Sequence, residues 1–99
     1  MRRSRREEHI RGLLRKLLTS RERFFHKGVL NSDGRKVLEE IIKHVAATHP
    51  EHMEAARRAR RDPCLENILR LARLYLGSEA DEIIASWTRG PYRYGVDDT

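Results

Sequence analysis

The chain has 99 residues, of which 38% are hydrophobic and 36% are charged, and its formal net charge is +6. A chain of this length forms one domain with a thin core. Its apolar runs are only a few residues long, which excludes a bilayer-spanning segment, and the Arg-rich N-terminus lacks the apolar region of a secretory signal. We therefore expect no membrane partner, and we expect a thin-cored chain to gain stability from copies of itself or from another protein.

Cysteine usage and charge distribution indicate the setting and the class of partner. The single cysteine, Cys64, cannot form an internal disulfide, which is typical of an intracellular, reducing environment. Residues 1–27 hold ten Lys or Arg against three acidic residues, whereas residues 28–99 hold eleven against twelve. Of the 21 basic residues 17 are Arg, which binds phosphate and carboxylate through two N–H groups at once. Nucleic acid or an acidic protein surface is therefore the first partner class to consider.

The N-terminal segment carries the first helical pattern. Apolar residues from Ile10 to Phe25 recur every three or four positions, which predicts a basic helix over residues 5–26. Thr19 and Glu22 have the spacing of a capping box, which would restart the helix there. The unbroken apolar stripe favours one helix, either straight or kinked.

A turn and a second helix follow. Gly28 is expected to end the first helix, and the segment Asn31-Ser32-Asp33-Gly34 has the composition of a turn and an N-cap. The apolar stripe after it predicts a second helix over residues 33–47.

Three further helices are predicted in the second half of the chain. Thr48 and Glu51 have capping-box spacing and predict a third helix over residues 49–61 that is poor in large apolar groups. Asp62 and Pro63 are predicted as the N-cap and first residue of a fourth helix.

The last predicted elements are the end of the fourth helix, a short fifth helix and a tail. Gly77 is expected to end the fourth helix, and Ser78 begins a short fifth helix that includes Trp87. Residues 88–99 have no apolar periodicity and are predicted to form an extended tail. No stretch alternates apolar and polar residues for long enough to predict a strand.

The predicted fold class is all-α. We expect a small bundle of four to five short helices, with a basic N-terminal helix and an extended C-terminal tail. Residues 1–87 form the single helical domain. Seven apolar side chains are expected to pack together in its core: Leu38, Ile41, Ile42, Leu65, Ile68, Leu69 and Leu76.

Two groups of basic residues are candidates for contact with nucleic acid or an acidic partner. For the first group, on the N-terminal helix, the alternative is a solvated helix face. The alternative for the second is helix stability, because cations are favoured at a helix C-terminus. The first group is Arg2, Arg3, Arg5, Arg6, Arg11, Arg15 and Lys16, and the second is Arg57, Arg58, Arg60 and Arg61.

A third candidate site lies at the end of the chain, where aromatic residues alternate with arginines. Such residues are typical anchors of a segment that docks on another protein, and stacking on single-stranded bases is a second use. The alternative is a tail that folds back on its own core. The residues of this docking candidate are Trp87, Arg89, Tyr92, Arg93 and Tyr94.

The sequence contains one weak metal-binding pattern and no catalytic motif. His49 and His52 lie three positions apart, with His44 and Glu51 nearby, and this spacing offers two zinc ligands. No H-E-x-x-H motif or second cysteine accompanies them, so we predict no metal. Cys64 is expected to be an inert, partly buried thiol. The sequence contains no P-loop, dinucleotide fingerprint or nucleophile elbow. We therefore predict no enzyme activity, no catalytic residue, no cofactor and no small-molecule substrate.

Two segments resemble a family of small structural proteins of short-tailed phages, the Bordetella-phage structural-protein family. Within residues 25–45, Ser32-Asp33-Gly34-Arg35-Lys36-Val37-Leu38 resembles the family's turn-glycine-basic-valine-leucine helix start. Within residues 53–69, Ala55-Ala56-Arg57-Arg58-Ala59-Arg60-Arg61-Asp62 resembles its Arg-rich element. Ala59 stands where the family has glycine, and Ala46-Ala47-Thr48-His49 stands where it has aromatic residues. The resemblance covers under half of the chain and implies a virion component without catalytic residues.

The basic residues, the thin core, the aromatic tail and the resemblance together give the functional expectation. We expect a non-enzymatic phage structural or assembly protein, a multi-copy helical component near the portal-tail region or packaged DNA, in the virion or the host cytoplasm. The alternatives are a small basic DNA-binding regulator, or an adaptor or inhibitor that docks on a host protein. A regulator would need a helix-turn-helix, but the helix after Gly34 exposes a charge mixture that suits groove reading poorly: Lys36, Glu39, Glu40 and Lys43.

Overall fold

The computed structural model describes residues 5–88, and within this range the fold is all-α, as predicted. Its only strands form one small antiparallel pair. Arg2, Arg3 and residues 89–99 lie outside the described residues. The elements in chain order are α1 (Arg5–Thr19), α2 (Arg21–Phe24), β1 (Phe25–His26), β2 (Val29–Leu30), α3 (Ser32–Thr48), the 3-10 helix η1 (Pro50–His52), α4 (Met53–Arg61), α5 (Leu65–Leu76) and α6 (Ser78–Thr88).

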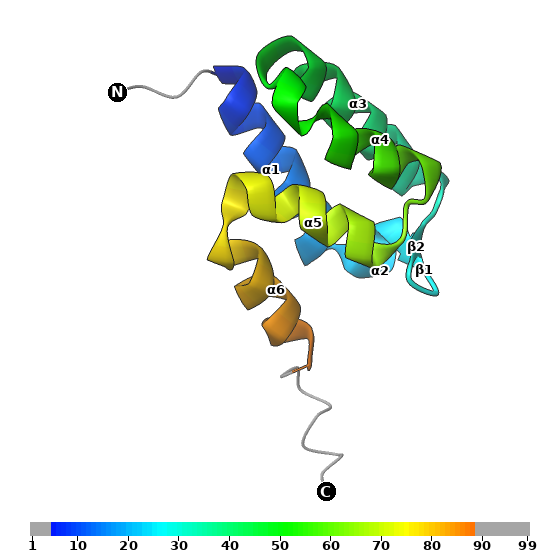
Figure 1. Cartoon of the computed structure of the whole chain (residues 1–99). Helices are drawn as coiled ribbons and strands as arrows, with labels where there is room; N and C mark the ends of the chain where they lie inside the picture. The colour runs from blue at the N-terminus through cyan, green and yellow to red at the C-terminus, as the bar shows by residue number, and fades with distance from the viewer. Residues whose placement is uncertain (1–4, 89–99) are drawn as a thin grey trace, which may run out of the picture.

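Helix α1 contacts α3, α5 and α6, and α4 packs on α3 and α5 (Figure 1). The apolar stripe of α1 is fully buried at Ile10, Leu14, Leu17 and Leu18. By contrast, α4 buries only Ala56 and Ala59, so its apolar contribution is small and its charged side chains cover most of its surface. No helix among the described residues is both long enough and apolar enough to cross a membrane.

The predicted core is confirmed as one cluster. Five of its seven members are buried, and Leu65 and Leu69 are partly buried against the same cluster. The buried five are Leu38, Ile41, Ile42, Ile68 and Leu76.

The predicted single helix over residues 5–26 is wrong. The helix ends at Thr19, because Ser20 leaves the helical conformation with φ −112° and ψ 47°. The Thr19 hydroxyl donates to the Arg15 carbonyl, so it does not cap the next helix. The short α2 that follows turns Phe24 into the core, where it is 3% exposed.

A β-hairpin follows α2, although no strand was predicted. Lys27 and Gly28 form its turn with positive φ values of 53° and 83°, so Gly28 is a hairpin turn residue and not the end of a helix. The second strand, β2, is also paired on the side away from β1: the Leu30 amide donates to the Pro63 carbonyl, and the Leu65 amide donates to the Gly28 carbonyl. These bonds join two segments more than thirty positions apart.

The same pairing explains why α5 starts later than predicted. The segment around Pro63 is extended to meet β2, so α5 begins at Leu65, with Cys64 as an N-cap that makes no side-chain bond. Asp62 and Pro63 are therefore not the N-cap and first residue of α5. The capping box at Thr48 is also wrong, because the Thr48 hydroxyl donates to the His44 carbonyl instead. By contrast, the turn before α3 is confirmed: the Asn31 side chain accepts from the Gly34 amide at 2.8 Å.

Candidate functional site

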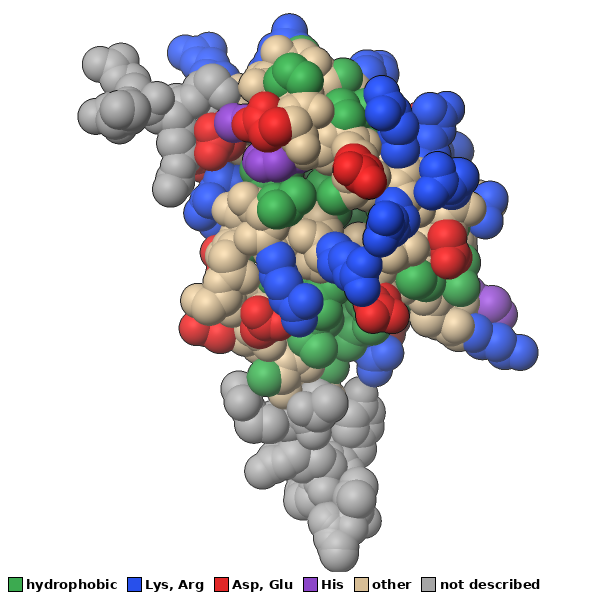
Figure 2. All heavy atoms as spheres, viewed as in Figure 1, with side chains coloured by type: hydrophobic (Ala, Val, Ile, Leu, Met, Phe, Trp, Pro, Cys, Tyr) green, Lys and Arg blue, Asp and Glu red, His purple; other side chains and the backbone are tan. Residues whose placement is uncertain are grey.

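A basic surface lies on α4, whose second half carries exposed arginines (Figure 2). Arg57, Arg58 and Arg61 are exposed and make no ion pair within residues 5–88. Arg60 is bound to Glu39 of α3, with 3.1 Å between Arg60 Nε and Glu39 Oε2. We call Arg57, Arg58 and Arg61 the α4 arginine cluster. It offers three unneutralised guanidinium groups to a polyanion.

The predicted basic group on the N-terminal helix is divided by the fold. Arg11 donates to the Tyr75 carbonyl at the C-terminal end of α5. Arg15 makes an ion pair with Glu79 in the first turn of α6, with 2.6 Å between Arg15 Nε and Glu79 Oε2. This contact raises the pKa of Arg15 and lowers that of Glu79, mainly through the hydrogen bond between them. Arg11 and Arg15 therefore attach α1 to the α5–α6 corner, and they are not free for an external partner.

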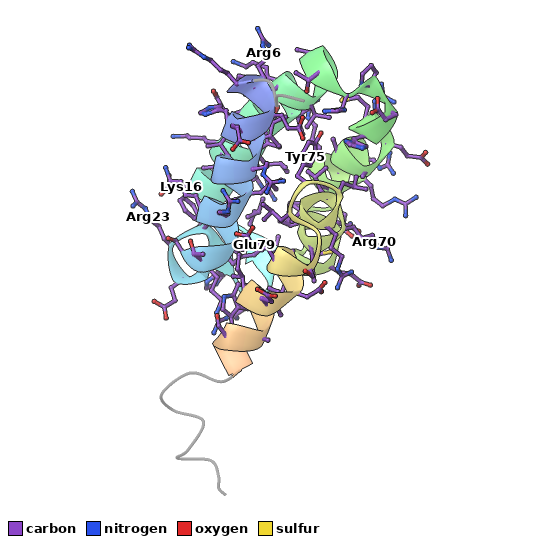
Figure 3. All side chains as sticks on the ribbon, turned by 90° about the vertical axis from the view of Figure 1, so that its left-hand side faces the viewer. Arg6, Lys16, Arg23, Arg70, Tyr75 and Glu79 are labelled. Carbon is purple, nitrogen blue, oxygen red and sulfur yellow. The ribbon has the colours of Figure 1, made fainter. Side chains whose placement is uncertain are left out.

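The remaining basic residues of this group face outward. Arg5, Arg6 and Lys16 are exposed. Figure 3 shows Arg6, Lys16 and Arg23 along one outer edge of α1 and α2, whereas Tyr75 and Glu79 lie toward the interior between the helices. Among residues 5–88, the outer edge of α1 and the α4 arginine cluster are thus distinct basic surfaces.

A groove separates α4 from α5 beside the α4 arginine cluster. Its walls carry Arg58 and Arg70, and its apolar lining includes Leu74, which is 48% exposed. The pairing of guanidinium groups with an exposed leucine is typical of a surface that contacts protein. The lining residues are Glu51, His52, Glu54, Ala55, Arg58, Asn67, Arg70 and Leu74.

Trp87 is held by its own chain. Its indole N–H donates to the Leu18 carbonyl at 3.0 Å, and the Arg21 guanidinium lies 4.7 Å from the ring centroid. These contacts match the alternative in which this part of the chain folds back on its own core. The other members of the predicted docking group, Arg89, Tyr92, Arg93 and Tyr94, lie outside the described residues.

Histidines gather where the start of α1 meets the end of α3. His49, at the end of α3, is flanked by two carboxylates: its Nδ1 lies 3.0 Å from Glu51 Oε2, and its Nε2 lies 3.5 Å from Glu7 Oε1. His52 stacks on His49, and its Nδ1 lies 2.9 Å from the Tyr75 hydroxyl. The hydrogen bond with Glu51, and then that with Glu7, raise the pKa of His49. Burial raises the pKa of Tyr75 to about 12, so this hydroxyl stays protonated.

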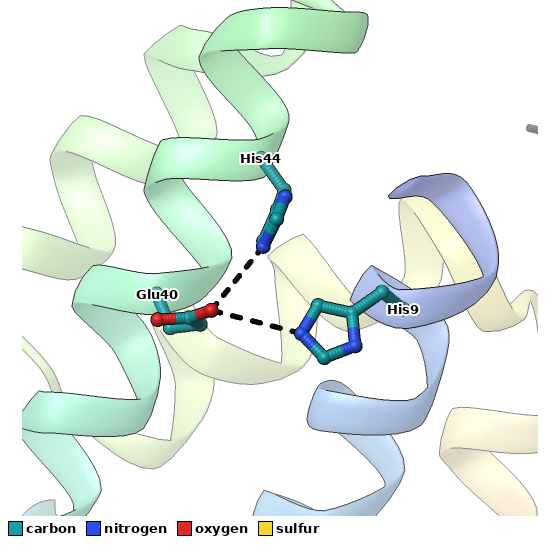
Figure 4. A group of neighbouring side chains, drawn as sticks. All are labelled: His9, Glu40 and His44. Carbon is teal, nitrogen blue, oxygen red and sulfur yellow. Dashed lines mark hydrogen bonds and ion pairs between the residues drawn. The ribbon is translucent and has the colours of Figure 1, made fainter. Parts of the chain in front are cut away.

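A second group forms from His9 of α1 and Glu40 and His44 of α3 (Figure 4). Glu40 and His44 are one helical turn apart and point toward the same side of α3, and His9 approaches from the neighbouring helix. Glu40 Oε2 lies 3.3 Å from His44 Nε2 and 3.7 Å from His9 Nε2. His44 was a candidate ligand from the sequence, but His9 and Glu40 were not, because residues 31 positions apart meet only when α1 packs on α3.

The His49 contacts predict a dependence of stability on pH. A raised folded-state pKa stabilises the fold fully below the unfolded value of about 6.5, and this stabilisation is lost as pH rises through the folded value. We therefore expect His49→Gln to lower the thermal midpoint near pH 6 by no more than about 5 °C, and by less at pH 8.5.

Thermal melts followed by Trp87 fluorescence and by circular dichroism measure this difference. His26→Gln is the matched control, because His26 is exposed on the hairpin and away from this group. A loss for His49→Gln that is equal at both pH values would show that the His49 contacts do not depend on its charge.

Comparison with known proteins was made by family, by sequence and by structure. No protein-family model, no curated protein and no solved structure matches this chain.

Proposed function

We propose that this chain is a non-enzymatic binding protein that attaches to a polyanion through the α4 arginine cluster. The observation that carries the proposal is the exposure of Arg57, Arg58 and Arg61 on one helix without an ion-pair partner in residues 5–88. Guanidinium groups placed this way bind phosphates or carboxylates and release counterions. The position of the cluster near the C-terminal end of α4 also favours helix stability, so binding must be separated from folding in the test.

The resemblance to small structural proteins of short-tailed phages indicates where the chain would act, namely in a phage particle. In that setting the chain is a multi-copy structural or assembly component of the particle, and the polyanion is packaged DNA or an acidic surface of another virion protein. A protein inventory of purified particles from the phage that encodes this chain tests the setting. Particles that lack the chain would contradict it.

Replacing Arg57, Arg58 and Arg61 together with alanine is expected to reduce the salt dependence of DNA binding. Each lost phosphate contact lowers the slope of log K against log salt by about 0.9, so the triple variant should lose roughly 2–3 units of slope. Fluorescence anisotropy of a labelled duplex at several salt concentrations measures this, and affinity should fall evenly across DNA sequences.

The matched comparison is the triple variant Arg5→Ala, Arg6→Ala, Lys16→Ala, which removes the same charge from the outer edge of α1. If only this second variant loses slope, the N-terminal helix is the contact and the α4 arginine cluster has a role in helix stability alone. A wild-type chain that shows no salt-dependent binding to DNA contradicts nucleic acid as the polyanion. Sequence-selective protection in footprinting would favour the alternative of a DNA-binding regulator.

The groove between α4 and α5 favours a second candidate, an adaptor that docks on an acidic segment of a protein. Arg58 stands beside the exposed Leu74, and Arg70 is paired with Glu66 at 3.6 Å, so within residues 5–88 one unpaired guanidinium and an apolar contact are available to one peptide. An acidic peptide with one central leucine is the probe, and Leu74→Asp tests the groove. Loss of peptide binding in Leu74→Asp with DNA binding retained would favour the adaptor.

A further inference from the structure

The group formed by His9, Glu40 and His44 has the composition of a divalent-metal site. Two imidazoles and one carboxylate are the ligands that zinc and neighbouring transition metals accept. Their ligand atoms all lie within 4.8 Å of one another. Atoms bound at about 2.0–2.2 Å around a tetrahedral ion lie roughly 3.4 Å apart. The observed separations of 3.3 Å and 3.7 Å from Glu40 Oε2 fall on either side of that value.

The orientation of the three side chains also favours a divalent-metal site. Both histidines direct Nε2 toward one carboxylate oxygen, as the dashed lines in Figure 4 show. The two rings meet edge to face at 84° with 4.8 Å between centroids, so neither ring blocks the nitrogen of the other. The His9 and Glu40 side chains are 50% and 46% exposed, and that of His44 is 21% exposed. An ion can therefore enter from solvent and keep water in its remaining position.

We propose that His9, Glu40 and His44 bind one Zn²⁺ ion that joins α1 to α3. The sequence predicted no metal, because no H-E-x-x-H motif or second cysteine accompanies its histidines, and His9 lies more than thirty positions from Glu40. The ion would add a bond between the two helices that share the most extensive contact in the fold. Because such an ion binds the folded chain and not the separated helices, it would act as a structural clamp, independently of the partner bound at α4.

The neighbouring group of His49, Glu51 and His52 is the competing site, since its ligand atoms are equally close. Its histidines have partners outside the group, however, whereas His9 and His44 both face Glu40 of their own group. His49 is flanked by Glu51 and Glu7, which raise the pKa of its imidazole, and His52 Nδ1 meets the Tyr75 hydroxyl. A proton held on His49 competes with a metal ion. We therefore place the ion at His9, Glu40 and His44.

The proposal is tested with the full untagged chain, freed of metal by a chelator and titrated with Zn²⁺ in a calorimeter. We expect one ion per chain with a dissociation constant on the order of 1–100 µM, weaker than a closed four-ligand site. His9→Ala and His44→Ala should each weaken binding by at least about tenfold, and Glu40→Gln should weaken it because the anionic ligand is lost. The paired variant His49→Ala, His52→Ala should bind as the wild type does.

Two further readouts separate a site from a folding defect. At a Zn²⁺ concentration 100 times the dissociation constant, the ratio of folded to unfolded chain should rise about 100-fold, and it should rise less in His9→Ala. Because His9 is half-exposed, His9→Ala should keep the wild-type circular dichroism spectrum. Nitrogen-15 NMR of the imidazoles should place the ion on Nε2 of His9 and His44.

Three results would overturn the proposal. The first is no saturable binding below 1 mM, which is on the order of a non-specific surface contact. The second is binding lost in the His49→Ala, His52→Ala variant and kept in His9→Ala, which would move the ion to the competing group. The third is unchanged affinity in both His9→Ala and His44→Ala.

Discussion

Replacing Ile41 with alanine is expected to lower the free energy of unfolding by about 2–5 kcal/mol. Ile41 is fully buried where α3 meets the rest of the core, so the variant loses apolar contacts and leaves a cavity. A domain of this size has only about 5–10 kcal/mol of stability in total, so the variant should unfold at a much lower urea concentration than the wild type. Urea titration followed by Trp87 fluorescence measures the loss.

Alanine variants of two leucines in α5 serve as comparisons for Ile41→Ala. Leu74→Ala should change the free energy of unfolding by less than about 1 kcal/mol, because Leu74 is 48% exposed. Leu69→Ala should fall between the two, because Leu69 is only partly buried. A cooperative and nearly unchanged melt of Ile41→Ala would show that α3 does not pack as described.

Gly34→Ala is expected to destabilise the fold by about 1–3 kcal/mol, although alanine is the better helix former. Gly34 is buried in the first turn of α3, against the end of α2 and the hairpin. A Cβ atom there would lie 2.5 Å from the Phe24 carbonyl oxygen and 2.7 Å from Leu30 Cδ2. The Phe24 oxygen also accepts from the Asn31 amide, so its backbone cannot withdraw without losing that bond.

Gly12→Ala is the matched control with the opposite sign. Gly12 is exposed in the interior of α1, and an added Cβ would meet no atom within 4 Å. The variant should therefore raise the free energy of unfolding by about 0.5–1 kcal/mol through helix propensity. Thermal and urea melts of both variants test the pair. Stabilisation by both alanines would contradict the close approach of α2 to α3.

The fold pairs some of the N-terminal basic residues within the chain, so the net charge of that segment is not all available to a partner. Composition placed all of the excess charge in residues 1–27. The fold uses Arg11 and Arg15 to hold α5 and α6, so part of that charge is engaged within the chain. Meanwhile α4, in the half of the chain with almost no net charge, presents three unpaired arginines. Local ion pairing, and not the charge of a segment, decides which basic residues can meet a partner.

Some elements followed directly from the sequence. The helix after Asn31 and the helix ended by Gly77 were predicted within about two residues, because each has a long apolar stripe and a local start or stop signal. The core positions on α3 followed from the same stripe. The all-α class, the exposure of the α4 arginines and the weak apolar face of α4 needed no knowledge of tertiary contacts.

Only the tertiary structure decided the rest, because the deciding contacts join residues far apart in the chain. The hairpin at Phe25–Leu30 is completed by hydrogen bonds to Pro63 and Leu65, which also delay the start of α5. The capping signals at Thr19 and Thr48 are the local exception, because each hydroxyl donates to the carbonyl four residues earlier in its own helix. The meeting of His9 with Glu40 likewise depends on α1 packing against α3. Periodicity and caps describe one helix at a time, and the placement of these side chains is set by what each helix packs against.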